Sequence, residues 1–137
     1  MADIEIFNPE GLASPRGTYS HVARAPAGAT LVALAGQVAI DRDGEVVGKD
    51  DFEAQCGQVY DNVGAALRGA GAGWENVIQS MTFLTRREDV ARFRAWRERA
   101  FADFFPSGVY PPNTLLVVSG LASEDLLLEV QVIAAVT

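Results

Sequence analysis

Hydrophobic residues recur along the chain at two spacings, which predict strands and helices respectively. Short stretches in which apolar residues alternate with polar ones, or follow one another directly, predict strands. They lie at residues 4–6, 18–24, 30–34, 76–84, 115–118 and 126–136. In the last stretch, Leu128, Val130 and Val132 share one face, and Glu129 and Gln131 share the other.

The first stretch with helical spacing lies between residues 50 and 71. Asp50 and Glu53 form a candidate capping box at its start, and Gly69 and Gly71 are expected to end it. Its apolar stripe has intervals of three or four residues and consists of Phe52, Cys56, Val59, Val63 and Leu67. We expect Cys56 to belong to the core, because no basic residue is placed to ionise its thiol.

The second helical stretch begins after Thr85 and Glu88, which form another candidate capping box, and is expected to end before Pro106 and Gly108. This stretch also holds a concentration of basic residues, namely Arg86, Arg87, Arg92, Arg94, Arg97 and Arg99. Acidic residues are interspersed among these arginines, which favours a solvated helix face over a nucleic-acid patch.

The predicted order of elements is three strands, a helix, a strand, a helix and two strands. This order indicates an α+β domain in which two helices cover one face of a β-sheet. The other face, on which we place Val32, Leu34 and Val117, is too apolar to remain in contact with water. The pattern therefore predicts that the chain associates with copies of itself.

The composition narrows the class of protein. Hydrophobic residues make up 49% of the 137 residues, enough for the core of one domain over residues 1–137. The net charge of −7 argues against binding to a phosphate backbone. No apolar run approaches the ~20 residues of a membrane span, and no secretory signal is recognisable. We expect a cytoplasmic protein that binds neither nucleic acid nor membrane.

The sequence also limits the candidate chemistry. A single Cys56 excludes an internal disulfide. There is no Gly-rich phosphate loop and no Cys/His set with metal-ligand spacing. One histidine and one cysteine are too few for an evident catalytic triad. We therefore expect no metal and no organic cofactor.

A series of short motifs occurs in a defined order over residues 19–134. They are Gly17-Thr18-Tyr19, Ala35-Gly36-Gln37, Gln55 with Asn62-Val63, Ala70-Gly71, Thr82-Phe83-Leu84, and the strand from Leu127 to Ala134. In this order and spacing the chain resembles the Rid (YjgF) family of small proteins. The resemblance implies a chorismate-mutase-like α+β fold, a homotrimer with a central barrel, and small-molecule pockets between neighbouring subunits. It also implies hydrolysis of reactive imines and enamines without a cofactor.

The resemblance assigns roles to two positions at which this chain has the same residue as the Rid family. Glu129 matches the family glutamate that holds and polarises the attacking water, and Tyr19 matches the tyrosine that shapes the pocket. Ala35 stands where the family has a pocket serine, and Gly36 is expected to let a ligand or chain approach the backbone closely.

Asn113, followed by Thr114, departs from the family pattern. In the deaminases this position is an arginine that grips the substrate carboxylate, whereas asparagine offers a neutral amide without the guanidinium fork. The chain thus resembles a subgroup that lacks the deaminase arginine. Asn113 remains a candidate for binding a neutral ligand carbonyl, and Arg94 is a candidate replacement cation or else a solvated arginine.

Other roles and functions stay open from the sequence. His21 is a candidate acid or base on the same face as Tyr19, or else a strand-surface histidine. Glu129 is either a general base or part of a polar interface network with Gln131. The function is imine or enamine hydrolysis, a specialised pathway reaction on a bulkier substrate, or non-catalytic metabolite binding or chaperone-like action by the trimer. The acidic charge disfavours ribonuclease activity.

Overall fold

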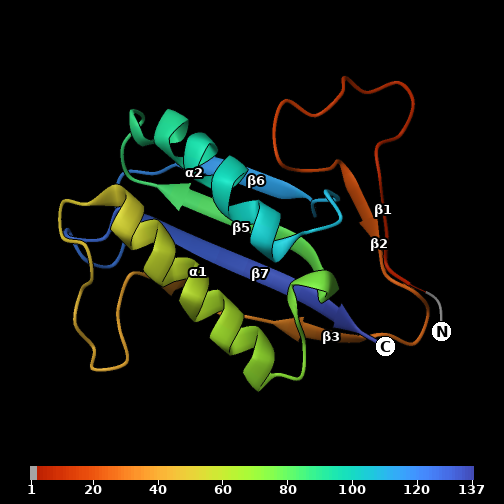
Figure 1. Cartoon of the computed structure of the whole chain (residues 1–137), viewed down its shortest axis with the longest axis horizontal. Helices are drawn as coiled ribbons and strands as arrows, with labels where there is room; N and C mark the ends of the chain where they lie inside the picture. Colours follow the sequence, from red (N-terminus) through yellow and green to blue (C-terminus); the bar gives the residue numbers. More distant parts are fainter. Residues whose placement is uncertain (1–2) are drawn as a thin grey trace.

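Two helices lie on one face of a mixed β-sheet in the computed structural model, which describes residues 3–137 (Figure 1). The sheet has the strand order β3 (Thr30–Ala33), β7 (Leu128–Val136), β5 (Val77–Leu84) and β6 (Asn113–Val117). A short strand β4 (Gln37–Val38) also pairs with β7. Strands β5 and β6 run parallel, and the other pairs are antiparallel. The predicted α+β architecture is confirmed.

The N-terminal strands form a separate two-stranded sheet. Strand β1 (Glu5–Phe7) pairs with β2 (Val22–Arg24), beside the main sheet in Figure 1. The strand predicted over 18–24 therefore begins only at Val22. The backbone N–H of His21 donates to the side-chain oxygen of Asn8 at 2.8 Å, so it is not free for a strand ladder.

Helix α1 (Phe52–Gly69) begins one residue later than the predicted cap. Asp51 is the N-cap, and its carboxylate accepts a hydrogen bond from Ala54 N at 3.1 Å. Asp50 instead has a φ of 59°, outside the extended region that an N-cap residue adopts, so the predicted capping box is wrong. The helix ends as expected, with Gly71 in the left-handed region at a φ of 74°.

The core lies between the helices and the sheet. All five residues of the predicted α1 stripe are buried, and they face Leu128, Val130 and Val132 of β7. Cys56 is fully buried, and burial raises the pKa of its thiol far above the usual range. The prediction that Cys56 belongs to the core is confirmed.

Helix α2 (Asp89–Phe104) follows a turn without a capping box. Neither Thr85 nor Glu88 provides a side-chain cap, because the N-cap Glu88 has a helical backbone conformation. Thr85 is tied to the sheet through its N–H, which donates to the carbonyl of Leu127 at 3.2 Å. Asp89 opens the helix and is fully buried.

The arginine-rich face of α2 is not uniformly solvated. Asp89 accepts hydrogen bonds from Arg86 at 2.8 Å and from Arg92 at 2.7 Å. Arg94 is exposed, as predicted for a solvated arginine. Arg97 is only 4% exposed, which corrects the prediction that the whole cluster lies on a solvated face.

The helix-free face of the sheet carries other residues than predicted. Leu34 is buried in the core and Val32 packs against it, so both lie on the helix side of β3. Leu31 points to the face opposite Val32 and is 65% exposed, and Leu116 on β6 is 41% exposed. The helix-free face is therefore still partly apolar. In a continuous apolar run such as residues 31–34, the sequence does not reveal whether the odd-numbered or the even-numbered side chains point into the core.

Among residues 3–137, neither helix combines the length and the apolar character needed to cross a membrane.

Candidate functional site

A hollow of about 310 Å³ lies on the helix-free side of the sheet. Glu129 and Gln131 of β7 and Phe83 of β5 line it, together with Gly36 from the connection between β3 and β4, and Leu121. Glu129 pairs with Phe83 across the two strands, so both side chains project to the same face. The alternation predicted for residues 126–136 therefore places the carboxylate in the hollow.

Gly36 permits this position of the Glu129 side chain. A β-carbon built on Gly36 would lie only 2.7 Å from Cδ and 2.9 Å from Cγ of Glu129. Any side chain at position 36 would therefore displace the carboxylate. A ligand or chain segment was expected to approach the Gly36 backbone closely, and the group that does so is the side chain of Glu129 in the same chain.

The Glu129 carboxylate is available for chemistry. Among residues 3–137, no basic side chain forms an ion pair with it. Glu129 is half-buried, so a water or small ligand in the hollow can reach its oxygens. An unpaired carboxylate in this setting can orient water and accept a proton from it.

Neither Ala35 nor Thr114 is among the residues that line the hollow. Ala35 is exposed next to Gly36, and its carbonyl accepts a hydrogen bond from the Gln37 amide at 3.1 Å. Thr114 pairs with Met81, which in turn pairs with Gln131. Thr114 is thus two strands, roughly 10 Å, away from the hollow.

Tyr19 and His21 form a second cluster, in the irregular segment before β2. Their rings meet edge to face at 5.8 Å and 89°, so the two residues lie together as expected. The Nε2 atom of His21 lies 2.7 Å from the carbonyl oxygen of Ala13. Because that oxygen can only accept, Nε2 carries the proton, and no residue of the described range 3–137 bonds to Nδ1. Ser20 bridges to Pro112, which brings this cluster to the start of β6.

Asn113 points toward the helix side of the sheet. Its side-chain oxygen accepts hydrogen bonds from Ser80 Oγ at 2.9 Å and from Thr82 Oγ1 at 3.0 Å. Arg94 is on α2, which covers that same side, and is directed to solvent. Within one chain, neither Asn113 nor Arg94 therefore contributes to the hollow around Glu129.

The sequence did not single out Arg97, although its helical spacing with Phe93 and Phe101 was a signal that it faces inward. Its guanidinium carbon lies 4.9 Å from the ring centre of Phe93 and 5.9 Å from that of Phe101. Burial lowers the pKa of Arg97, and the nearby Tyr60 and Glu98 offset this lowering only in part. Only the tertiary structure brings this cation next to the segment that carries Tyr19.

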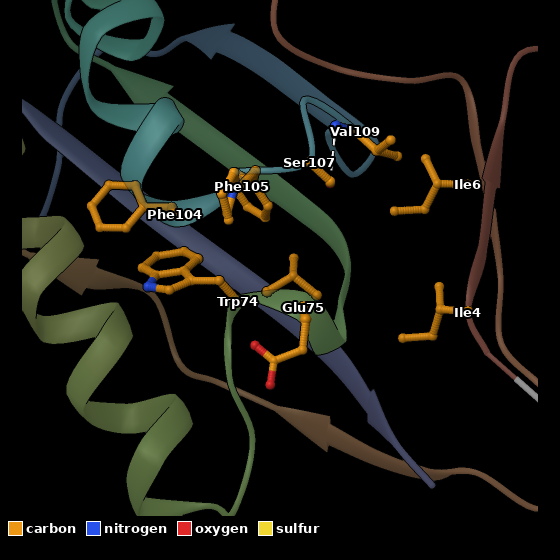
Figure 2. Close-up of a pocket in the computed structure, with 10 residues that line it drawn as sticks. Ile4, Ile6, Trp74, Glu75, Phe104, Phe105, Ser107 and Val109 are labelled. Carbon is orange, nitrogen blue, oxygen red and sulfur yellow. Dashed lines mark hydrogen bonds between the residues drawn. The ribbon is translucent and has the colours of Figure 1, made fainter. Parts of the chain in front are cut away.

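A cavity of about 450 Å³ lies elsewhere, between β1 and the end of α2. Figure 2 shows Ile4 and Ile6 facing Trp74 and Phe105 across it. Its lining is mostly apolar, and Glu75 is its only ionisable residue. The cavity includes none of the residues predicted to carry chemistry, so we regard the Glu129 hollow as the candidate site.

Comparison with known proteins identifies the relatives of this chain. The family profile described as endoribonuclease L-PSP matches residues 11–136. A RutC family protein of Synechocystis is 32% identical over 96% of this chain and 95% of its own.

Solved structures agree with this assignment. The Rid family protein YyfB of Yersinia pestis, whose function is unknown, superposes with a TM-score of 0.86 at 29% identity, covering 98% of this chain and all of its own. The YjgF gene product of E. coli, at 24% identity and a TM-score of 0.67, covers 95% of this chain and 97% of its own and shares the fold. The chain belongs to the Rid (YjgF) family, and its sheet and two helices have the fold of that family.

Proposed function

We propose that this chain forms a homotrimeric enzyme that hydrolyses small reactive imines or enamines, with water activated at Glu129. The observation that carries the proposal is the unpaired Glu129 carboxylate over Gly36, in a hollow that a small molecule can enter. Membership of the Rid family supports the same chemistry.

We further propose that each pocket forms between two copies of the chain. The predicted site residues fall into two groups in one chain, Glu129 with Gly36 and Tyr19 with His21. A neighbouring copy on the helix-free face would cover the exposed Leu31. Such a copy could bring its Tyr19 and His21 to the hollow, which would complete the pocket.

In this mechanism Glu129 removes a proton from water as the water oxygen attacks the imine carbon. The electron pair of the C=N π bond moves to nitrogen. Glu129 then returns the proton to the nitrogen, which gives a carbinolamine. The same carboxylate next transfers the hydroxyl proton of the carbinolamine to the nitrogen, the C–N bond breaks, and ammonia leaves as the carbonyl forms. The net reaction consumes one water and yields one carbonyl compound and one ammonia. His21 of the neighbouring copy is a candidate second base, because the unprotonated Nδ1 of its neutral ring can accept a proton.

The substrate differs from that of the standard 2-aminoacrylate deaminases. Asn113 carries no charge, and its amide oxygen is engaged with Ser80 and Thr82. A substrate carboxylate therefore has no guanidinium on β6. Ribonuclease activity, which the family description names, is disfavoured by the net charge of −7.

The test is the variant Glu129→Gln, which keeps size and hydrogen bonding but removes the base. Imines are generated in situ from small amino acids by an amino-acid oxidase, and release of the carbonyl product is followed. We expect turnover to fall by about 10²-fold or more while light scattering still reports a trimer. Unchanged turnover would contradict the role of Glu129. A wild-type trimer that binds such metabolites without turnover would favour the metabolite-binding alternative.

A further inference from the structure

The cavity between β1 and the end of α2 has the size of a small-molecule site. Its volume is about 450 Å³, and small-molecule sites generally measure about 300–1,000 Å³. Its walls come from β1, from the short 3-10 helix η1 (Trp74–Asn76) with the start of β5, and from the end of α2 with the residues that follow it. None of the lining residues also lines the Glu129 hollow, so the two places are separate.

Two different kinds of apolar wall face each other across this cavity. Ile4 and Ile6 of β1 line it and are half-buried, whereas Glu5 between them is exposed. On the opposite wall, the rings of Trp74 and Phe105 face these two isoleucines (Figure 2). Flat rings pack well against another ring in an offset or edge-to-face arrangement. The walls therefore suit a ligand with an apolar, aromatic body.

Glu75 supplies a charged acceptor at the margin of the cavity, between Trp74 and Ile4 in Figure 2. Its side chain folds back over Gly73, where an added β-carbon would lie only 2.6 Å from Oε1 of Glu75. The Gly73 N–H donates to the side-chain oxygen of Asn76 at 2.8 Å and not to this carboxylate. Among residues 3–137, no basic side chain forms an ion pair with Glu75. The carboxylate is therefore available to a cation in the cavity.

The charge around this end of the cavity has one sign. Glu75 and Ile4 also line an adjoining hollow of about 270 Å³, to which Asp3 contributes a second carboxylate. Within residues 3–137, no basic side chain lines either the cavity or the hollow. The net charge of −7 adds to the negative potential there. These charges favour a cationic ligand and disfavour an anionic one.

We propose that this cavity binds a small amine with an aromatic body, whose ring lies between Ile6 and Trp74 and whose ammonium group donates to Glu75. Burial of the ring supplies most of the affinity, because it removes apolar surface from water on both walls. The exposed carboxylate adds less, and it selects the charge of the ligand. This site is distinct from the proposed catalytic site, and the inference does not depend on imine hydrolysis.

The experiment compares three probes that share a phenylethyl group, namely 2-phenylethylamine, 2-phenylethanol and 3-phenylpropanoate. Titration calorimetry on the full-length protein measures their binding at neutral pH. We expect the amine to bind with a Kd of about 1 mM or tighter. It should bind at least about threefold more tightly than the alcohol, and the carboxylate should bind most weakly. The preference for the amine should shrink in about 1 M salt, which screens an exposed charge.

Four variants locate the site. Glu75→Gln should bind the amine and the alcohol within about twofold of each other, with the affinity for the alcohol unchanged. Ile6→Phe adds a larger side chain to the cavity wall and should weaken both probes at least about tenfold. Glu98→Gln removes an exposed carboxylate of α2 that does not line the cavity, and this matched control should bind like the wild type. Glu129→Gln should also bind the amine like the wild type, because its hollow is a different place.

Tryptophan fluorescence gives a second readout at the cavity itself. The chain has two tryptophans, Trp74 in the cavity wall and Trp96 on α2, so Trp96→Phe leaves Trp74 as the only tryptophan. Its emission should change on titration with 2-phenylethylamine, with the affinity that calorimetry reports. An emission that does not change while calorimetry shows binding would place the amine elsewhere and overturn the inference.

The remaining outcomes are equally decisive. Amine binding that depends on both Glu75 and Ile6 supports the inference even if no imine is hydrolysed. No binding of 2-phenylethylamine at about 10 mM overturns it, as does a preference for the amine that survives in Glu75→Gln or disappears in Glu129→Gln. A wild type that binds no probe, with an Ile6→Phe variant that no longer self-associates, would assign the cavity to a neighbouring copy and likewise overturn it.

Discussion

The side chain of Glu129 lies against the α-carbon of Gly36, in the space that a side chain at position 36 would occupy. The variant Gly36→Ala should therefore push the carboxylate out of place. We expect a destabilisation of about 1–3 kcal/mol from overpacking and a fall in turnover of about tenfold or more. Chemical denaturation and the imine assay measure the two effects.

Gly57 provides a matched control for this substitution. It lies within α1, and a β-carbon there would meet no atom within 4 Å. Gly57→Ala should leave turnover unchanged and stabilise the protein by about 0.5–1 kcal/mol, because alanine favours the helix. If Gly36→Ala behaved like Gly57→Ala, the contact with Glu129 would have no role in holding the carboxylate.

Asp89 should be important for stability, because its buried carboxylate binds both Arg86 and Arg92. Asp89→Asn removes the charge and one acceptor while keeping the size. We expect the free energy of unfolding to fall by about 1–3 kcal/mol. The exposed neighbour Glu88 is the control, since Glu88→Gln should change it by less than about 0.5 kcal/mol. Equal effects of the two variants would refute the role of burial.

Stability should decrease at alkaline pH, because burial raises the pKa values of Cys56 and Tyr60. Above about pH 9 the unfolded chain releases these protons while the native state keeps them, so the free energy of unfolding falls as pH rises. Each group contributes a slope of up to about 1.4 kcal/mol per pH unit. Unfolding of Tyr60→Phe at pH 7 to 11 should show a shallower decline than the wild type above pH 10. Parallel curves would exclude Tyr60 as a source of the effect.

Much of the fold was predictable because it is encoded locally. The stripe from Phe52 to Leu67 and the alternation around Glu129 follow from the periods of a helix and a strand. The N-cap of α1 was not predictable, because Asp50 and Asp51 are the same residue type and only the backbone conformation selects Asp51. Leu34 was misplaced because every residue from 31 to 35 is apolar.

The candidate site was predictable only in part. The strand period and the family motif both indicated Glu129, but its contact with Gly36 joins positions far apart in the sequence. Arg97 is the same residue type as its exposed neighbour Arg94, and its helical spacing with Phe93 was the sequence signal that it faces inward. Asn113 was expected at a ligand, whereas strand parity directs it to Ser80. These relationships depend on tertiary packing, which local patterns do not contain.

The central claim, that two copies of the chain complete one pocket, is tested most directly by mixing two inactive variants. Glu129→Gln lacks the base, and Tyr19→Ala lacks the second cluster. The two proteins are unfolded together, refolded as mixed trimers and assayed on the imine that the wild type hydrolyses fastest. If Glu129 of one chain acts with Tyr19 of its neighbour, the mixture should regain about a quarter of the wild-type activity. Mixed trimers, verified by mass spectrometry, that remain as inactive as their parents would contradict the claim.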